Sequence, residues 1–331
     1  MMNATPRLAV AALVAVAACT DKAPAVATAD TSGTDTTVVV AALPEGEARL
    51  AVAGGNIWYK VSGKGDGIPV ILLHGGPGFN SFYLKPFEAL GDERVVVRYD
   101  QLGGGKSDGM TDTATMTIPH FVAELEALRA HLRFDKVHIV GHSWGTMLAM
   151  EYYRAHPTHV ASLSLGGSVM SVPEYAANAK KLVKTLSDSS QRAIREGEAA
   201  GKYDTPAYQN AMSEFYGKYV WLRPVPADLD STMSMINERI YNYMQGPSEF
   251  TINGTFKNYD ATPALRDVKV PTLYFVGEFD EVGADVVKRH ASMTPGSTYT
   301  RIPNSAHISP WDNPVFTVKA VRAHLKKSDP R

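Results

Sequence analysis

The chain has 331 residues, of which 44% are apolar and 20% charged, close to the averages of globular proteins, so it can bury a sizeable core. Lysine and arginine number 33 against 34 aspartates and glutamates, and the resulting net charge of −1 argues against nucleic acid as a partner. A single cysteine excludes an internal disulfide and a multi-cysteine zinc site.

The N-terminus has the features of an export signal. Arg7 precedes an uninterrupted run of Leu, Ala and Val over residues 8–18. This run spans only about 16 Å as a helix, roughly half of a bilayer core, which favours a signal peptide over a transmembrane helix. It ends on Val16-Ala17-Ala18-Cys19, which resembles a bacterial lipoprotein box. The resemblance implies cleavage before Cys19, lipidation of its sulfur and a periplasmic location, and Thr20 implies the outer membrane. A plain signal peptide with a chance cysteine is the alternative.

Residues 19–45 are rich in Thr and Ala and lack aromatic residues, so we expect a flexible tether there. After it, apolar runs predict strands, and apolar residues at helical spacing predict helices. The predicted strands are 48–53 and 56–62 (a hairpin), 70–73, 94–99, 137–140, 163–165, 271–276 and 298–302. The predicted helices are 118–132, 146–155, 284–293 and 315–325.

Alternating strands and helices predict an α/β fold with a mainly parallel sheet. Residues 168–262 contain no strong strand pattern and interrupt this alternation. We therefore expect a core made of residues 46–167 and 263–331, with a helical cap inserted between them. The cap holds twelve of the thirty aromatic residues, some of which we expect to wall a pocket and exclude water.

A serine motif lies between a predicted strand and a predicted helix. Gly141-His142-Ser143-Trp144-Gly145 matches G-x-S-x-G, which is common by chance but specific in a strand–turn–helix setting. The turn is so tight that side chains at Gly141 and Gly145 would collide with the neighbouring chain. We therefore predict that Ser143 is a nucleophile exposed at the carboxyl edge of the sheet. A structural turn serine is the alternative.

A serine hydroxyl needs a base, and in enzymes with this motif the partners follow in the order serine, acid, histidine. Asp280 comes directly after the strand at 271–276 and is the predicted acid, with Asp285 as the fallback. The role of Asp280 would be to orient the imidazole and stabilise the charged form of that ring. His307 lies in a loop before the last helix and is the predicted base. His290 and His324 fall in helical patterns, and we expect both to face solvent.

Two backbone N–H groups are needed to stabilise the oxyanion. The residue after the nucleophile, Trp144, supplies one. The loop His74-Gly75-Gly76-Pro77-Gly78 follows the strand at 70–73, and its glycines let the backbone approach a substrate closely. We predict Gly76 as the second donor. His74 ends a buried strand, and we expect it to be a hydrogen-bonded structural residue.

Residues 46–327 resemble the proline iminopeptidase (prolyl aminopeptidase) family of α/β-hydrolases. HGGPG at 74–78, DQLGGGKS at 100–107, GHSWG at 141–145 and GEFDEV at 277–282 carry the resemblance. The closest likeness is to the tricorn-interacting aminopeptidase, whose cap carries a stretch similar to 244–255. Leu102 departs from the family pattern, which often has Arg there, and the Trp-rich cap pattern of the larger prolyl aminopeptidases is missing.

The resemblance implies that Glu249, Glu281 and Tyr241 hold the free α-amine of a peptide. An ammonium that leaves water needs compensating carboxylates, so these acids would make the enzyme an exopeptidase. If Glu249 and Glu281 are instead solvated surface acids, the same triad fits an esterase, amidase or lactonase. A non-catalytic binding lipoprotein is a further alternative. The expected substrates are short peptides or aminoacyl amides, and the mechanism requires no metal or cofactor.

Overall fold

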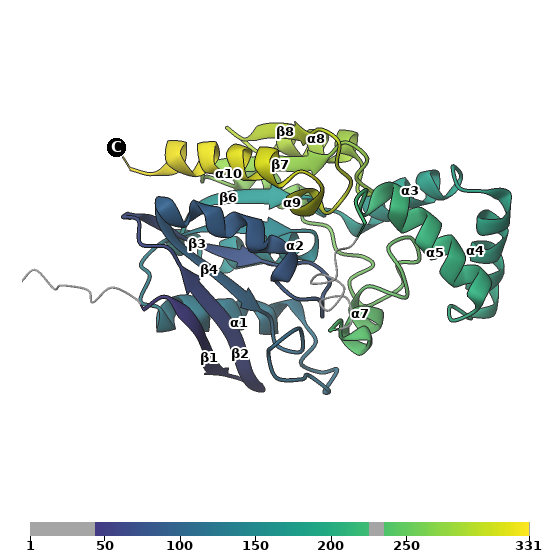
Figure 1. Ribbon diagram of the computed structural model, residues 1–331, viewed down its shortest axis with the longest axis horizontal. Coiled ribbons are helices and arrows are strands. Elements are labelled where there is room, and N and C mark those ends of the chain that lie inside the picture. The colour runs from purple at the N-terminus through teal and green to yellow at the C-terminus, as the bar shows by residue number, and fades with distance from the viewer. Residues whose placement is uncertain (1–43, 225–234, 331) are drawn as a thin grey trace, which may run out of the picture. The chain divides into compact units, whose positions relative to one another are not determined.

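The computed structural model describes residues 44–224 and 235–330. Within these ranges an eight-stranded sheet has the order β1-β2-β4-β3-β5-β6-β7-β8 (Figure 1). β1 pairs antiparallel with β2 and β2 with β4, and the remaining neighbours are parallel. The strands are Gly46–Val52 (β1), Gly55–Ser62 (β2), Gly67–Leu73 (β3), Arg94–Asp100 (β4), Val137–His142 (β5), Val160–Gly166 (β6), Thr272–Gly277 (β7) and Thr298–Ile302 (β8).

Helices cover both faces of this sheet because both faces of its strands are apolar. In β3, Ile71 and Leu73 pack on the side of α1 and α2, whereas Val70 and Leu72 pack on the side of η1 and α10. The helices flanking the sheet are Phe82–Asp92 (η1), Ile118–His131 (α1), Trp144–Ala155 (α2), Pro157–His159 (η2), Thr262–Asp267 (η3), Ala284–Met293 (α8), Ser309–Asp312 (α9) and Pro314–Ser328 (α10). The α/β fold with a mainly parallel sheet is thereby confirmed.

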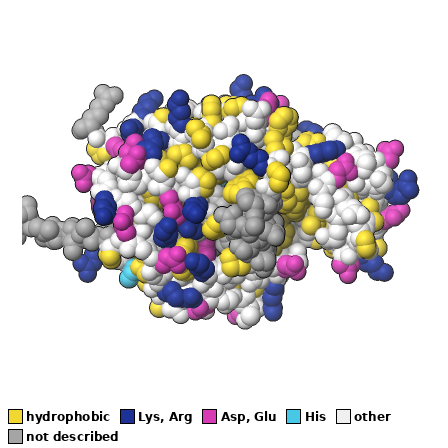
Figure 2. Space-filling view, in the orientation of Figure 1, with side chains coloured by type: hydrophobic (Ala, Val, Ile, Leu, Met, Phe, Trp, Pro, Cys, Tyr) yellow, Lys and Arg dark blue, Asp and Glu magenta, His cyan; other side chains and the backbone are white. Residues whose placement is uncertain are grey.

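The segment between β6 and β7, called the cap here (residues 168–262), contains helices and, over residues 246–261, loops and turns. Its helices are Val172–Val183 (α3), Asp188–Ala200 (α4), Pro206–Tyr219 (α5) and Glu238–Met244 (α7). They lie beyond one end of the strands (Figure 1). Figure 2 shows lysines, arginines, aspartates and glutamates interspersed over one face of the molecule, in line with the small net charge.

The predicted strands and helices outside the cap are all present, with ends that differ by a few residues. The sequence did not predict η1 because a 3₁₀ segment lacks the helical spacing of apolar residues, and Pro86 lies inside it. The predicted signal peptide (1–18), Cys19 and the tether up to residue 43 lie outside the described residues.

One buried carboxyl in the core makes stability depend on pH. Glu124 on α1 is 3% exposed; its Oε2 accepts the Leu102 N–H at 3.0 Å, and its Oε1 has no hydrogen-bond partner. Burial raises the pKa of Glu124 from 4.5 to about 8. The unfolded chain therefore loses this proton at lower pH than the folded chain. The contribution of Glu124 to the free energy of unfolding therefore falls as pH rises from about 4.5 to 8.

We expect Glu124→Gln to remove this fall, because an amide cannot ionise. Urea denaturation should show that the free energy of unfolding of the variant rises by about 3 kcal/mol relative to that of the native protein between pH 5 and pH 8. Glu196→Gln, a matched change at an exposed position of α4, should leave the profile unchanged. A Glu124→Gln difference that stays constant over this range would contradict the assignment.

Candidate active site

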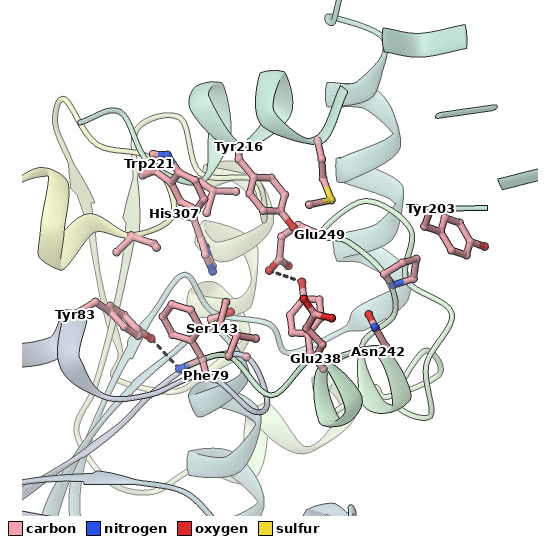
Figure 3. Close-up of a pocket in the computed structure, with 18 of the residues that line it drawn as sticks. Phe79, Tyr83, Ser143, Tyr203, Tyr216, Trp221, Glu238, Asn242, Glu249 and His307 are labelled. Atoms are coloured by element: carbon pink, nitrogen blue, oxygen red, sulfur yellow. Dashed lines mark hydrogen bonds between the residues drawn. The ribbon is translucent and has the colours of Figure 1, made fainter. Parts of the chain in front are cut away.

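The predicted site residues meet at the ends of four parallel strands, with β6 lying between two of them, β5 and β7. β3 runs into the loop 74–78, β5 into Ser143, β7 into Asp280 and Glu281, and β8 into the loop that carries His307. The carboxyl ends of parallel strands share one edge of a sheet, so these loops converge although they are far apart in sequence. Residues of this edge and of the cap line a cavity of about 490 Å³ (Figure 3).

Ser143 occupies a strained turn between β5 and α2. Its backbone angles are φ 56° and ψ −127°, a conformation that residues other than glycine rarely adopt. A Cβ at Gly141 would lie 2.5 Å from the Gly145 oxygen, and one at Gly145 would lie 2.3 Å from the Leu73 oxygen. The Ser143 N–H donates to the Gly166 oxygen of β6 at 2.9 Å. The glycines and this bond allow the turn, and Ser143 lines the cavity.

Asp280 and His307 form a buried pair beside it. His307 Nδ1 lies 2.9 Å from Asp280 Oδ1, which also accepts the Val282 N–H at 3.0 Å. Burial disfavours the charged imidazole, but the Asp280 carboxylate outweighs burial and raises the pKa of His307 above its usual value. The fallback Asp285 is exposed on α8, and its carboxylate is not the one that holds His307.

His307 turns its other ring nitrogen toward Ser143, and both residues line the cavity (Figure 3). His307 Nε2 is buried and makes no hydrogen bond, so the Ser143 hydroxyl is not bonded to it in this state. Such bonds are commonly long in free enzymes and shorten when substrate binds. The arrangement offers a base, held by an acid, that faces the serine.

Gly167 is a site residue that the sequence analysis did not identify. A Cβ at this position would lie 2.6 Å from His307 Cε1 and 3.2 Å from Asp280 Oδ2, and its φ of +52° also favours glycine. Only a residue without a side chain lets the acid–base pair lie against the end of β6. The pair Gly166-Gly167 directly after a strand is the signal that could have indicated this close approach.

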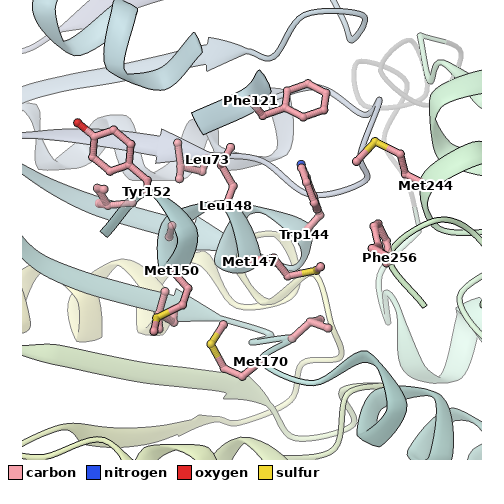
Figure 4. Close-up of a cluster of buried hydrophobic side chains, with 14 of the residues drawn as sticks. Leu73, Phe121, Trp144, Met147, Leu148, Met150, Tyr152, Met170, Met244 and Phe256 are labelled. Carbon is pink, nitrogen blue, oxygen red and sulfur yellow. The ribbon is translucent and has the colours of Figure 1, made fainter. Parts of the chain in front are cut away.

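The predicted oxyanion donors flank the serine. Gly76 lines the cavity beside Ser143, and Trp144 is the first residue of α2, where backbone N–H groups lack partners within the helix. The Trp144 indole is buried and stacks on Phe256 at 5.8 Å between ring centroids (Figure 4). Its Nε1–H donates to Gln101 Oε1 at 2.8 Å. His74 is structural as expected, because its Nε2 accepts the Gln101 N–H at 3.0 Å.

Two carboxylates lie near this catalytic edge. Glu249 from the cap lines the cavity and accepts hydrogen bonds from Tyr241 at 2.7 Å and from Tyr175 at 2.6 Å. Glu281 is fully buried, both of its oxygens lack a hydrogen-bond partner, and its Oε1 lies 3.7 Å from His307 Nε2. Burial, together with the charges of Glu249 and Asp280, raises the pKa of Glu281 well above its usual range. Glu281 is not among the described residues that line the cavity, and its carboxyl lacks the hydrogen-bond donor that a buried polar group usually has.

Two expectations about other histidines are wrong. His290 is fully buried rather than solvated, because its ring packs under the cap and its Nε2 bonds Glu174 Oε2 at 2.7 Å. His324 is half-buried, and burial lowers its pKa to about 4. Helical spacing alone did not show that these faces are covered by other elements.

Within residues 44–224 and 235–330, no helix is long and apolar enough to cross a bilayer. The same residues contain no group of three or more His, Cys, Asp or Glu side chains that could hold a metal ion.

Comparison with known proteins agrees with this geometry. Residues 68–314 match the family model described as alpha/beta hydrolase fold. The chain is 37% identical over 278 residues to a proline iminopeptidase of Heyndrickxia coagulans, covering 81% of this chain and 94% of that protein. It is 35% identical to a proline iminopeptidase of Saccharolobus solfataricus, covering 80% of this chain and 87% of that protein.

Two solved structures share the arrangement. The crystal structure of a proline iminopeptidase of Mycobacterium smegmatis superposes with a TM-score of 0.78 at 28% identity, covering 86% of this chain and 98% of that one. The crystal structure of a protein called VinJ superposes with a TM-score of 0.82 at 29% identity, covering 86% of this chain and 99% of that one.

Proposed function

The chain belongs to the alpha/beta hydrolase fold family and, within it, to the proline iminopeptidases, and from this membership we propose that it is a serine exopeptidase of the prolyl aminopeptidase type. It releases the N-terminal residue, proline included, from short peptides or aminoacyl amides. The observation that carries this proposal is Glu281, a fully buried carboxyl without hydrogen-bond partners beside the acid–base pair.

The proposed reaction uses Ser143, His307 and Asp280 as a triad. His307 takes the proton of the Ser143 hydroxyl as its oxygen attacks the first carbonyl of the peptide, and the N–H groups of Gly76 and Trp144 stabilise the oxyanion. His307 then protonates the leaving amine. Asp280 keeps the imidazole in the tautomer with its proton on Nδ1 and stabilises the imidazolium. Water, activated by His307, releases the acyl group from Ser143.

The free α-amine binds, in this proposal, to Glu249 and Glu281 with Tyr241 beside them. Tyr241 and Tyr175 donate to Glu249, which fixes that carboxylate at the cavity wall. An ammonium would supply the missing donors to Glu281 and offset the repulsion between the two acids. A peptide with a blocked N-terminus would leave both acids without this compensation. The cap residues 244–255 support a relation to the tricorn-interacting type.

A panel of arylamides tests the function. Prolyl, alanyl and leucyl arylamides with a free amine are compared with their N-acetylated forms and with a simple acyl ester. We expect turnover of the free-amine compounds and at least a 100-fold lower kcat/KM for the acetylated ones. Equal rates with and without the acetyl group, or hydrolysis of the ester alone, would favour the esterase, amidase or lactonase alternative.

We also propose that the protein is exported and held to the outer membrane by a lipid on Cys19, with residues 19–45 as a tether. The sequence of residues 7–20 supports this proposal. Cys19→Ala should release the protein from the membrane fraction into the soluble periplasmic fraction, measured by immunoblot of separated fractions. A Cys19→Ala protein that stays in the membrane fraction would contradict the lipid anchor.

A further inference from the structure

His142 has no part in the reaction described above, yet it lies next to the nucleophile and is buried, with 1% of its surface exposed. Both ring nitrogens are hydrogen-bonded. Nδ1 lies 2.9 Å from the Tyr83 hydroxyl, and Nε2 lies 2.8 Å from the backbone oxygen of His307. The last side chain of β5 therefore contacts the loop that carries the base directly.

The chemistry of the partners fixes the direction of each bond. The His307 carbonyl only accepts, so His142 Nε2 carries the proton and His142 Nδ1 is an acceptor. The Tyr83 hydroxyl must then donate to Nδ1, which leaves its oxygen free to accept the Gly75 N–H at 2.7 Å. Three bonds thus run in one direction, from Gly75 through Tyr83 and His142 to His307.

Burial and the nearby His307 lower the pKa of His142 to about 3. The ring therefore stays neutral at ordinary pH and keeps one donor and one acceptor. A charged ring would carry two donors and lose the bond from Tyr83.

This line of hydrogen bonds connects the loop that carries the oxyanion donor to the loop that carries the base. Gly75 directly precedes the proposed oxyanion donor Gly76, and a Cβ at Gly75 would lie 3.0 Å from Ser143 Cβ. At the other end, the bonded oxygen belongs to the base itself. The rings of His142 and His307 are in contact as well, with centroids 4.8 Å apart. Both ends line the cavity together with Ser143, and Figure 3 shows Tyr83 and His307 near it.

We propose that His142 is a positioning residue that, through Tyr83, holds the oxyanion loop and the loop of the base at fixed positions around Ser143. The proposal rests on the serine mechanism given above. The His142 ring lines the cavity, but the proposal gives it no hydrogen bond to substrate, since both ring nitrogens are already bonded within the protein. Its loss should lower the rate of attack by Ser143 and leave binding of the amine unchanged, because a small displacement of reacting groups costs rate more than affinity.

The test uses His142→Leu, His142→Gln and Tyr83→Phe, with kcat and KM measured on a free-amine arylamide. For His142→Leu we expect kcat to fall by about 100-fold with KM within threefold of the native value. The kcat of His142→Gln should be at least tenfold higher than that of His142→Leu, because the amide again offers one donor and one acceptor. Combining Tyr83→Phe with His142→Leu should cost little more than His142→Leu alone, since both changes break the same line of bonds.

His138→Leu is the matched control. His138 is buried in the same strand and bonds Ser162 Oγ at 2.7 Å and Asp329 at 3.1 Å. Its loss should lower the Tm and leave kcat unchanged at a temperature where the variant is folded. Tyr83→Phe keeps the ring and serves if His142→Leu does not fold.

Three results would overturn the proposal: native kcat in folded His142→Leu or Tyr83→Phe, a rise in KM at constant kcat, or a Gln variant no better than Leu. Failure of the serine mechanism is distinguishable, because a fluorophosphonate would then not label Ser143 in the native protein. If Ser143 of the native protein is labelled and the variants keep full rate, only the role of His142 is refuted.

Discussion

Ser143→Ala is expected to lower kcat on a free-amine arylamide by four to six orders of magnitude, on the scale of about 10⁶ known for removal of a nucleophilic serine. The hydroxyl is held at the edge of the cavity by a strained turn, and Ser143 is the only serine or threonine among the described residues that line the cavity. Steady-state kinetics measures the loss in kcat, with the concentration of folded enzyme determined for each variant.

Ser213→Ala provides the control for this change. Ser213 is exposed on α5, and its hydroxyl bonds only the Gln209 oxygen of its own helix. The control should keep the native kcat. If Ser143→Ala retained more than a tenth of the native rate, the acyl-enzyme mechanism would be refuted.

Glu249→Gln should separate recognition of the amine from catalysis. Removing one charge of a desolvated ion pair costs about 3 kcal/mol, so kcat/KM for free-amine arylamides should fall by about 100-fold or more. A simple acyl ester has no ammonium, and its hydrolysis should change less than threefold. The ratio of the two losses is the quantity to measure.

Glu196→Gln makes the same chemical change at an exposed position of the cap and should alter neither rate. Equal losses on amide and ester by Glu249→Gln would mean that Glu249 only supports the structure of the cavity through Tyr175 and Tyr241. That outcome would remove the ground for calling the enzyme an exopeptidase.

Local patterns were sufficient to predict most of the sheet and the position of the serine. Solid apolar runs such as 70–73 indicate strands covered on both faces, and Gly141 and Gly145 mark a turn that only small residues fit. The order of acid and base along the chain then led to Asp280 and His307, which the structure places 2.9 Å apart.

What the sequence did not reveal depends on contacts between distant segments. His290 is buried where the cap residue Glu174 bonds its ring. Glycine is required at position 167 because the loops that carry Asp280 and His307 pack against it. The same holds for His142, whose partners are Tyr83 in η1 and His307 in the loop after β8. No periodicity within one element records such contacts, because they arise only when the sheet edge is assembled.

Competition for Ser143 tests the central claim most directly. The protein is treated with a fluorophosphonate in the presence of a free-amine peptide or its N-acetylated form, and the modified residue is located by mass spectrometry of peptides. We predict a single adduct on Ser143, formed more slowly with the free-amine peptide and at an unchanged rate with the acetylated one. An adduct elsewhere, or equal protection by both peptides, would contradict the account.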